Sequence, residues 1–142
     1  MTPLGLAAFQ FVGVPYLWGG NDYRGLDCSG FIVESFRSMG YNLEDMTSQM
    51  LYDHFRTRSG NFSCFPAKED CLLFYSTTKQ RNNISHVSIA LNNKLIIEAA
   101  GAGQNSLNMT RDDLLKDDAR VRIRPINYRG HQIVASIKVK YD

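Results

Sequence analysis

The sequence has few of the features that mark a specialised class of protein. Only three of its 142 residues are cysteines, and an odd number excludes a framework in which every cysteine is paired. No apolar run is long enough to cross a membrane. The net charge is only +2, which is too small to indicate nucleic-acid binding. With 44% apolar residues, we expect one globular domain over residues 1–142 that binds neither membrane nor nucleic acid.

The N-terminus also lacks an export signal. Residues 1–5 contain no basic segment followed by an apolar one, so we expect no signal peptide. The protein would then stay in a host cytoplasm, or reach the cell wall or periplasm by lysis, in a virion or through a dedicated secretion machine.

Metal-binding patterns are sparse as well. There is no C-x-x-C, and His54, His86 and His131 lie far apart in the sequence. We therefore expect no metal or other cofactor. A disulfide between Cys64 and Cys71 remains open, beside the alternative of two ordinary, half-buried thiols.

Basic residues gather loosely in one stretch, which contains Arg120, Arg122, Arg124 and Arg129. Alternating arginines in a strand are typical of its solvent-facing side, and we prefer this interpretation. The functional alternative is a weak attraction to an anionic surface such as a cell wall.

The first half of the sequence has helical periodicity. Apolar residues follow a spacing of three and four from Leu4 to Phe11. A second helix is expected from Asp27, as N-cap, to Gly40, as C-terminal stop. A third is expected over about residues 47–55, and a Gly-rich loop over residues 18–22 lies before the second helix.

The second half predicts strands. Residues 71–75 form an apolar run, and residues 86–91 and 94–99 flank a turn at Asn92-Asn93, which indicates a hairpin. Alternating patterns follow at residues 121–124 and 133–140. Helices followed by antiparallel strands predict an α+β fold.

Cys28 is the candidate nucleophile. It follows the expected N-cap Asp27 and so falls in the first turn of a helix, where unpaired N–H groups favour a thiolate. Gly30 keeps that turn uncrowded. A buried structural cysteine is the alternative, but the Gly-rich loop just before this helix favours a functional one.

His86 is the candidate base, because it opens a strand from which its ring can stand off the sheet toward a helix packed on that face. His54, at the end of a helix, and His131, in a loop, are expected on the surface.

Glu98 is the candidate third residue, which would orient the imidazole. A three-residue loop over residues 91–93, with Asn93 left-handed, would place Glu98 directly opposite His86. A two-residue turn at residues 92–93 would instead point Glu98 to the other face of the hairpin. The pattern alone slightly favours the two-residue turn, so a surface position for Glu98 stays open.

These segments together resemble the NlpC/P60 family of cysteine peptidases. Residues 15–20 (PYLWGG) and 27–31 (DCSGF) are similar to its P-Y-x-W-G-G and D-C-S-G-[FL] motifs. Residues 86–91 (HVSIAL) are similar to its H-V-G-I-Y-L strand, 70–74 (DCLLF) to its G-D-L-x-F-F strand and 47–49 (TSQ) to the R-T-S of its R-T-S-x-x-Q helix start. The similarity covers roughly residues 5 to 100.

The resemblance implies a papain-like fold, with N-terminal helices packed on a C-terminal antiparallel sheet, and roles for single residues. Cys28 would be the nucleophile, His86 the base, and Glu98 would replace the family's usual His, Asn or Gln. Such a carboxylate should raise the pKa of His86 and favour a thiolate–imidazolium pair. Tyr16 would line the site and help to hold the oxyanion.

The remaining roles concern substrate. Asp27 and Ser29 correspond to residues that meet the free amine of an L-Ala-γ-D-Glu stem peptide, although capping the helix is sufficient reason for Asp27. Trp18 is a candidate substrate-binding residue that we expect mainly to pack the loop. The resemblance thus implies a thiol protease that hydrolyses peptide bonds in peptidoglycan stem peptides.

The small size and missing signal resemble phage-encoded members, namely endolysins or tail-associated peptidases, or effectors injected into rival bacteria. Phage tail or secretion-machine components would then be further partners. The main alternative is a non-catalytic virion or wall-binding protein on the same scaffold, against which the intact Cys28 and His86 argue. An acyltransferase or lipid amidase usually has its His before its Cys, unlike this chain.

Overall fold

The computed structural model describes residues 2–22, 24–58, 60–64, 67–101, 107–116 and 118–140. The helices are α1 (Pro3–Phe9), α2 (Cys28–Ser38), α3 (Ser48–Arg56), α4 (Arg111–Lys116) and the 3-10 segment η2 (Ile126–Gln132). The strands are β1 (Asn21–Asp22), β2 (Gly25–Leu26), β3 (Phe62–Ser63), β4 (Cys71–Tyr75), β5 (His86–Ala90), β6 (Leu95–Ala100), β7 (Arg120–Pro125) and β8 (Ile133–Lys138). In these described ranges, no helix combines the length and apolar character needed to cross a bilayer.

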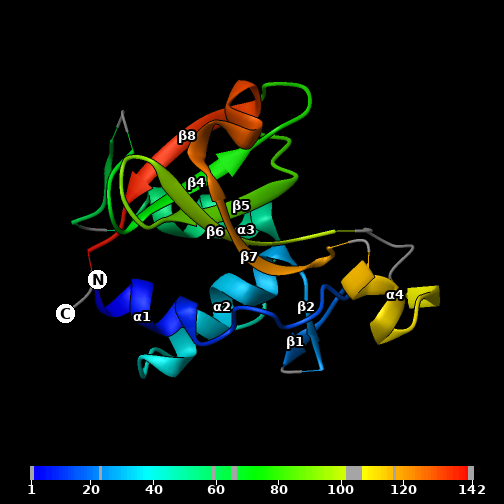
Figure 1. Ribbon diagram of the computed structural model, residues 1–142. Coiled ribbons are helices and arrows are strands. Elements are labelled where there is room, and N and C mark those ends of the chain that lie inside the picture. Colours follow the sequence, from blue (N-terminus) through cyan, green and yellow to red (C-terminus); the bar gives the residue numbers. More distant parts are fainter. Residues whose placement is uncertain are drawn as a thin grey trace.

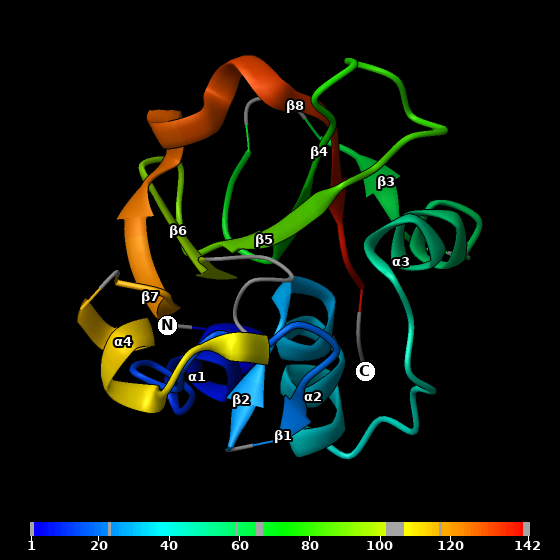
Figure 2. The same ribbon diagram turned by 90° about the vertical axis from the view of Figure 1, so that its right-hand side faces the viewer.

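Six strands form one sheet in the order β3-β8-β4-β5-β6-β7, and every pair in it is antiparallel. α1 and α2 lie below this sheet in both views, and α3 lies to one side of it (Figure 1, Figure 2). The predicted α+β class, with helices packed on an antiparallel sheet, is therefore confirmed. β8 comes last among the described strands but lies between β3 and β4.

The sheet buries side chains on both of its faces. Against the helices, Phe74 and Val87 pack with Phe31 of α2. On the other face, Leu73 and Tyr75 belong to a smaller buried cluster. All five residues of β4 are buried, which explains why the sequence shows an unbroken apolar run there instead of an alternation.

The helices begin where their capping residues predict. The Asp27 side chain accepts a hydrogen bond from Gly30 N at 2.6 Å, and Thr47 accepts one from Met50 N at 3.2 Å. After α2, Gly40 has a φ of 96°, the left-handed conformation that glycine adopts without strain. These caps place the first residues of α2 and α3 at fixed positions.

The β5–β6 hairpin has a loop of three residues, as one of the two predictions required, but the loop lies in another position. Leu91 N donates to Leu95 O at 2.9 Å, so the loop spans residues 92–94 and not 91–93. The prediction of a left-handed Asn93 is wrong, because Asn93 is not among the described non-glycine residues with positive φ. The Asn92 side chain closes the turn instead, by accepting from two backbone N–H groups.

Candidate active site

Cys28 is the first residue of α2 and lies against the Gly-rich loop. A Cβ atom on Gly30 would lie only 2.2 Å from Gly20 O, so the first turn of α2 packs directly on the loop backbone. The Asp27 carboxylate joins the two segments, because it accepts from Gly19 N at 3.1 Å and from Gly30 N at 2.6 Å. The thiol is thereby held at the positive end of the helix.

Ser48, in the first turn of α3, is a partner of the thiol that the sequence analysis did not single out. Cys28 Sγ lies 3.3 Å from Ser48 Oγ. The next residue, Gln49, accepts a hydrogen bond from Ile84 N at 2.8 Å through its Oε1. The start of α3 therefore contacts both the nucleophile and the loop that leads to His86.

His86 is the first residue of β5, and its ring lies between Cys28 and Glu98. Nε2 lies 2.7 Å from Glu98 Oε1, and the ring is close enough to the Cys28 side chain for each group to shift the pKa of the other. Because Nε2 is occupied by Glu98, Nδ1 is the nitrogen that remains for the sulfur. The structure thus brings together the three residues that the sequence analysis joined as nucleophile, base and orienting group.

His86 does not use the face of the sheet that the sequence analysis expected. It pairs with Tyr75 across β4 and β5, and the two rings lie 5.2 Å apart. Tyr75 belongs to the cluster on the face away from the helices, whereas the neighbouring Val87 packs against them. We infer that the imidazole meets Cys28 because it stands at the very start of β5, beside the beginning of α2.

The surroundings stabilise charge on all three groups. Burial disfavours the charged forms of His86 and Cys28, but their mutual interaction outweighs it, with help from Glu98 at the imidazole and from Ser48 at the thiol. The pKa of His86 is raised to about 9, and the pKa of the Cys28 thiol is lowered. Burial likewise opposes ionisation of Glu98, yet His86 and Arg129 hold the pKa of that carboxyl below its usual value.

Glu98 also binds two arginines that the sequence analysis did not assign to the site. Its side chain is fully buried. Oε2 accepts from Arg129 Nη2 at 2.7 Å and lies 3.2 Å from Arg124 Nε, a contact between charges without hydrogen-bond geometry. A carboxylate removed from water needs such partners.

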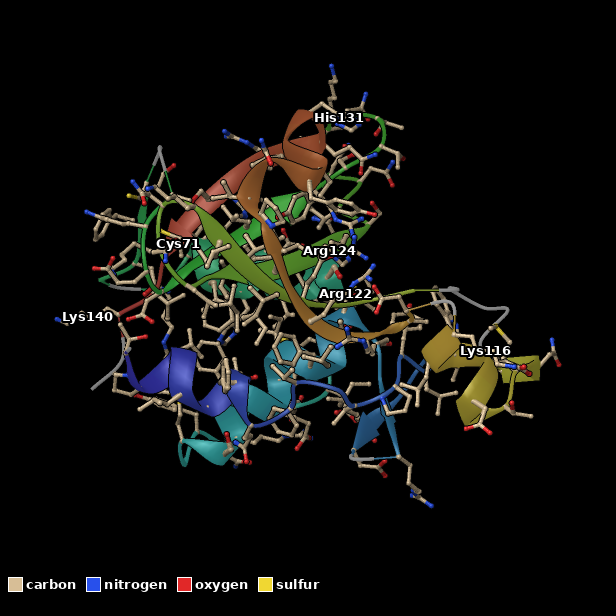
Figure 3. The ribbon with its side chains drawn as sticks, in the orientation of Figure 1. Cys71, Lys116, Arg122, Arg124, His131 and Lys140 are labelled. Carbon is tan, nitrogen blue, oxygen red and sulfur yellow. The ribbon has the colours of Figure 1, made fainter. Side chains whose placement is uncertain are left out.

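The prediction that the alternating arginines face solvent is therefore wrong for part of β7. The side chains of Arg122 and Arg124 are only 16% and 12% exposed, and Figure 3 shows both on this strand. Arg122 pairs with Asp118, as does Arg120. These arginines serve internal ion pairs.

A cleft of about 550 Å³ opens over Cys28 and His86. Tyr16 lines it and is almost buried, and burial together with the charges of Cys28 and Asp27 raises the pKa of its hydroxyl far above its usual value. The hydroxyl therefore remains a proton donor. Trp18 also lines the cleft and is 46% exposed, so it offers more surface than a residue that only packs the loop.

A second hollow of about 250 Å³ adjoins the first and shares Asp27, Ser29 and Thr47 with it. Ser29 Oγ donates to Asp27 Oδ1 at 3.3 Å. Asp27 thus acts in the structure as cap and loop anchor, and both Asp27 and Ser29 also border open space.

The rival histidines lie outside this constellation. His131 is exposed in η2, at the top of the view in Figure 3. His54 is partly buried against Phe55, which corrects the expectation of a surface position. In the described part of the chain, no three His, Cys, Asp or Glu side chains form a group able to hold a metal, and no disulfide joins Cys64 to Cys71 there.

Residues 13–123 match the family model described as NlpC/P60 family. Two relatives come from Bacillus subtilis (strain 168). The chain is 25% identical over 114 residues to gamma-D-glutamyl-L-lysine dipeptidyl-peptidase, and this match covers 80% of the chain and 37% of the relative. It is 31% identical over 97 residues to the bifunctional muramidase/DL-endopeptidase CwlT, and this match covers 68% of the chain and 28% of the relative.

The chain therefore spans little more than a third of the first relative and less than a third of the second. Among solved structures, RipD from Mycobacterium tuberculosis has a TM-score of 0.64 and 16% identity, with 99% of both chains covered. RipD is described as a non-catalytic NlpC/p60 domain protein adapted to peptidoglycan binding. At this identity the likeness shows the fold alone.

Proposed function

Because the chain belongs to the NlpC/P60 family, we propose that it is a cysteine endopeptidase or amidase acting on peptidoglycan stem peptides, next to γ-D-glutamate. The observation that carries this proposal is the chain of contacts from Cys28 through His86 to Glu98. Two relatives named as cell-wall peptidases support the choice of substrate.

The mechanism begins with the ion pair of Cys28 and His86. The thiolate attacks the carbonyl carbon of the scissile bond, and its electron pair forms the C–S bond while the carbonyl oxygen becomes an oxyanion. His86 then gives its Nδ1 proton to the leaving amine as the C–N bond breaks. Water, deprotonated by the now neutral imidazole, releases the acyl group and restores the thiolate–imidazolium pair.

The oxyanion has two proposed donors. The backbone N–H of Cys28 lies in the first turn of α2, where no intrahelical carbonyl uses it. Tyr16 retains its hydroxyl proton because its pKa is raised. Loss of one such donor typically lowers the rate by roughly a hundredfold or more.

The hollow beside Asp27 and Ser29 is the proposed site for the acyl part of the substrate. Asp27 brings a carboxylate to its border, and Ser29 a hydroxyl. These groups suit the free amine of an L-Ala-γ-D-Glu unit. Trp18 offers the exposed face of an indole to the same substrate across the cleft.

A non-catalytic wall-binding role is the second candidate, because RipD has this fold and is described as non-catalytic. The pKa of Cys28, lowered by His86, favours the enzyme instead. A neutral-pH alkylating probe separates the two, because a thiolate reacts far faster than a thiol. If the protein is an enzyme, Cys28 should be labelled fast in the wild type and more slowly in His86→Ala. If it is a binding module, labelling should be slow in the wild type and in His86→Ala alike.

The decisive experiment compares Cys28→Ala with Cys64→Ala on purified sacculi. Cys64→Ala should release stem-peptide fragments at the wild-type rate, and Cys28→Ala should release none while its circular dichroism spectrum is unchanged. Mass spectrometry of the fragments identifies the bond that is cut. Fragment release by Cys28→Ala would contradict the mechanism.

A further inference from the structure

Besides donating a hydrogen bond to Glu98, Arg129 lines the cleft over Cys28 and His86. Its side chain is 22% exposed. Thr77 and Gln132 border the same cleft. The guanidinium is thus a cationic group that a bound substrate can reach.

The chemistry assigns Arg129 to one end of the substrate. Cys28 bonds to the acyl part, whose proposed hollow lies at Asp27, whereas His86 protonates the leaving amine. Arg129 is joined to His86 through the single carboxylate of Glu98. It therefore lies on the side of the leaving group.

Positive charges outnumber negative charges around Glu98. Two arginines, Arg124 and Arg129, and the imidazolium of His86 face the carboxylate of Glu98 and the thiolate of Cys28. Around Glu98 itself this leaves one positive charge in excess, because the Asp27 carboxylate lies next to Cys28 and is bound to Gly19 and Gly30 instead of the arginines. Among the described residues, Glu98 is the one carboxylate that pairs with either arginine.

Arg129 also retains donors for a further anion. Its Nη2 donates to Glu98 at 2.7 Å and its Nε is buried, so the donors that a substrate in the cleft can reach are the remaining N–H groups of Nη1 and Nη2. A guanidinium carries five N–H donors in a fixed plane and binds carboxylates in pairs of hydrogen bonds. Arg124 is less able to do so, since it is 12% exposed and stacks 3.8 Å from the centre of the Tyr128 ring.

We infer that Arg129 is a specificity residue for a free carboxylate on the leaving-group residue, an inference that rests on the proposed function. A stem peptide with diaminopimelate in its third position carries such a carboxylate on the side chain, whereas lysine does not. The site thus selects the acidic class of stem peptide.

The test uses three peptides that share L-Ala-γ-D-Glu and an amidated C-terminus. Their third residue is diaminopimelate with a free side-chain carboxylate, the same residue with that carboxyl amidated, or lysine. Values of kcat/KM are measured for the wild type, Arg129→Gln, Arg129→Lys and Glu98→Gln. The amidated peptide separates the effect of charge from that of size.

The wild type should prefer the free carboxylate over its amide by roughly tenfold or more, the scale of a charged hydrogen bond. Arg129→Gln should remove this preference, Arg129→Lys should keep part of it, and Glu98→Gln should slow all three reactions but keep the preference. Arg129→Gln also removes a hydrogen bond to Glu98 and can slow the reaction for that reason alone. The decisive quantity is therefore the ratio of kcat/KM between two peptides, not the rate on one of them.

Equal wild-type rates on the three peptides would overturn the inference while leaving the hydrolase intact. An equal slowing of all three by Arg129→Gln would do the same and reduce Arg129 to a support for Glu98. If the wild type cuts none of them or any sacculus, the proposed function fails and takes the inference with it. A fourth peptide, with the α-carboxyl of its glutamate amidated, tests the acyl side. A wild-type preference that follows this amidation instead would place Arg129 on the acyl side, against the inference.

Discussion

The carboxylate of Glu98 reaches the imidazole of His86 along a diagonal of the β5–β6 hairpin, at a distance of 2.7 Å. The register pairs Ala90 with Ile96, and its continuation places Ser88, not His86, opposite Glu98. The contact thus depends on the length of the glutamate side chain and on the two arginines that hold its second oxygen. Ser88 is occupied elsewhere, by the Tyr75 hydroxyl at 2.8 Å.

Glu98→Gln should shift the alkaline limit of activity to lower pH. The pKa of His86 is raised to about 9, so the imidazolium is present below that pH and is lost above it. Removing the negative charge lowers this pKa, and the imidazolium is then lost at a lower pH. The measurement is kcat/KM against pH, which reports apparent values for the coupled Cys28–His86 pair. Glu34→Gln, on α2 and paired with Arg37, is the control, and an alkaline limit identical in both variants would contradict the role of Glu98.

Ser48→Ala should weaken the thiolate without changing the fold. The Ser48 hydroxyl lies 3.3 Å from the sulfur and lowers the pKa of Cys28. Without it, that pKa rises and the acid limit of activity moves to higher pH, with kcat/KM reduced by roughly tenfold or more, as for one hydrogen bond to a charged group. Ser38→Ala, in the last turn of α2, removes a hydroxyl that donates to Ser35 O and should leave the pH profile unchanged. An unshifted acid limit in Ser48→Ala would show that the hydroxyl does not act on the thiolate.

Gly30→Ala should destabilise the protein because the added methyl group meets the Gly20 carbonyl at 2.2 Å. Crowding of this kind typically costs about 1–3 kcal/mol in free energy of unfolding, which corresponds to a decrease in Tm of roughly 3–10 °C for a chain of this size. Gly130→Ala adds the same atom where nothing lies within 4 Å, so its Tm should stay close to that of the wild type. Equal melting temperatures for the two variants would exclude a tight contact between α2 and the loop.

Much of the scaffold follows from local signals in the sequence. Asp27 and Thr47 cap helices within three residues of themselves, and Gly40 ends α2 through its own φ. The hairpin partners β5 and β6 are separated by a three-residue loop. Each of these features depends on neighbours in the chain, which is why periodicity and turn chemistry predict it.

The missed parts of the site depend on contacts between distant segments. Arg124 and Arg129 reach Glu98 only because β6 and β7 pair in a register that places Arg122 opposite Glu98. Alternating arginines look the same in a sequence whether they face water or a buried carboxylate. The available signal was the acidic residue itself, since a glutamate inside an apolar strand requires cations near it. Ser48 has no such signal, because a hydroxyl in a first helical turn is ordinary.

Strands of two residues, such as β1, β2 and β3, are too short to show alternation. The 3-10 segment η2, which carries Arg129, is likewise irregular, with Arg129 itself at φ −132° and ψ 36°. Periodic patterns predict neither kind of element. The residue proposed to select the substrate therefore stands where sequence periodicity says least.

The insertion of β8 between β3 and β4 has a consequence for synthesis on the ribosome. Cys28, Ser48 and His86 are all made before residues 133–138, yet β4 lacks one of its two neighbours until those residues emerge. Arg129 also emerges late, only a few residues ahead of β8. A nascent chain therefore carries its thiol for most of the translation of this region without the finished sheet behind His86, and the proposed site is completed only when residues 133–138 have emerged.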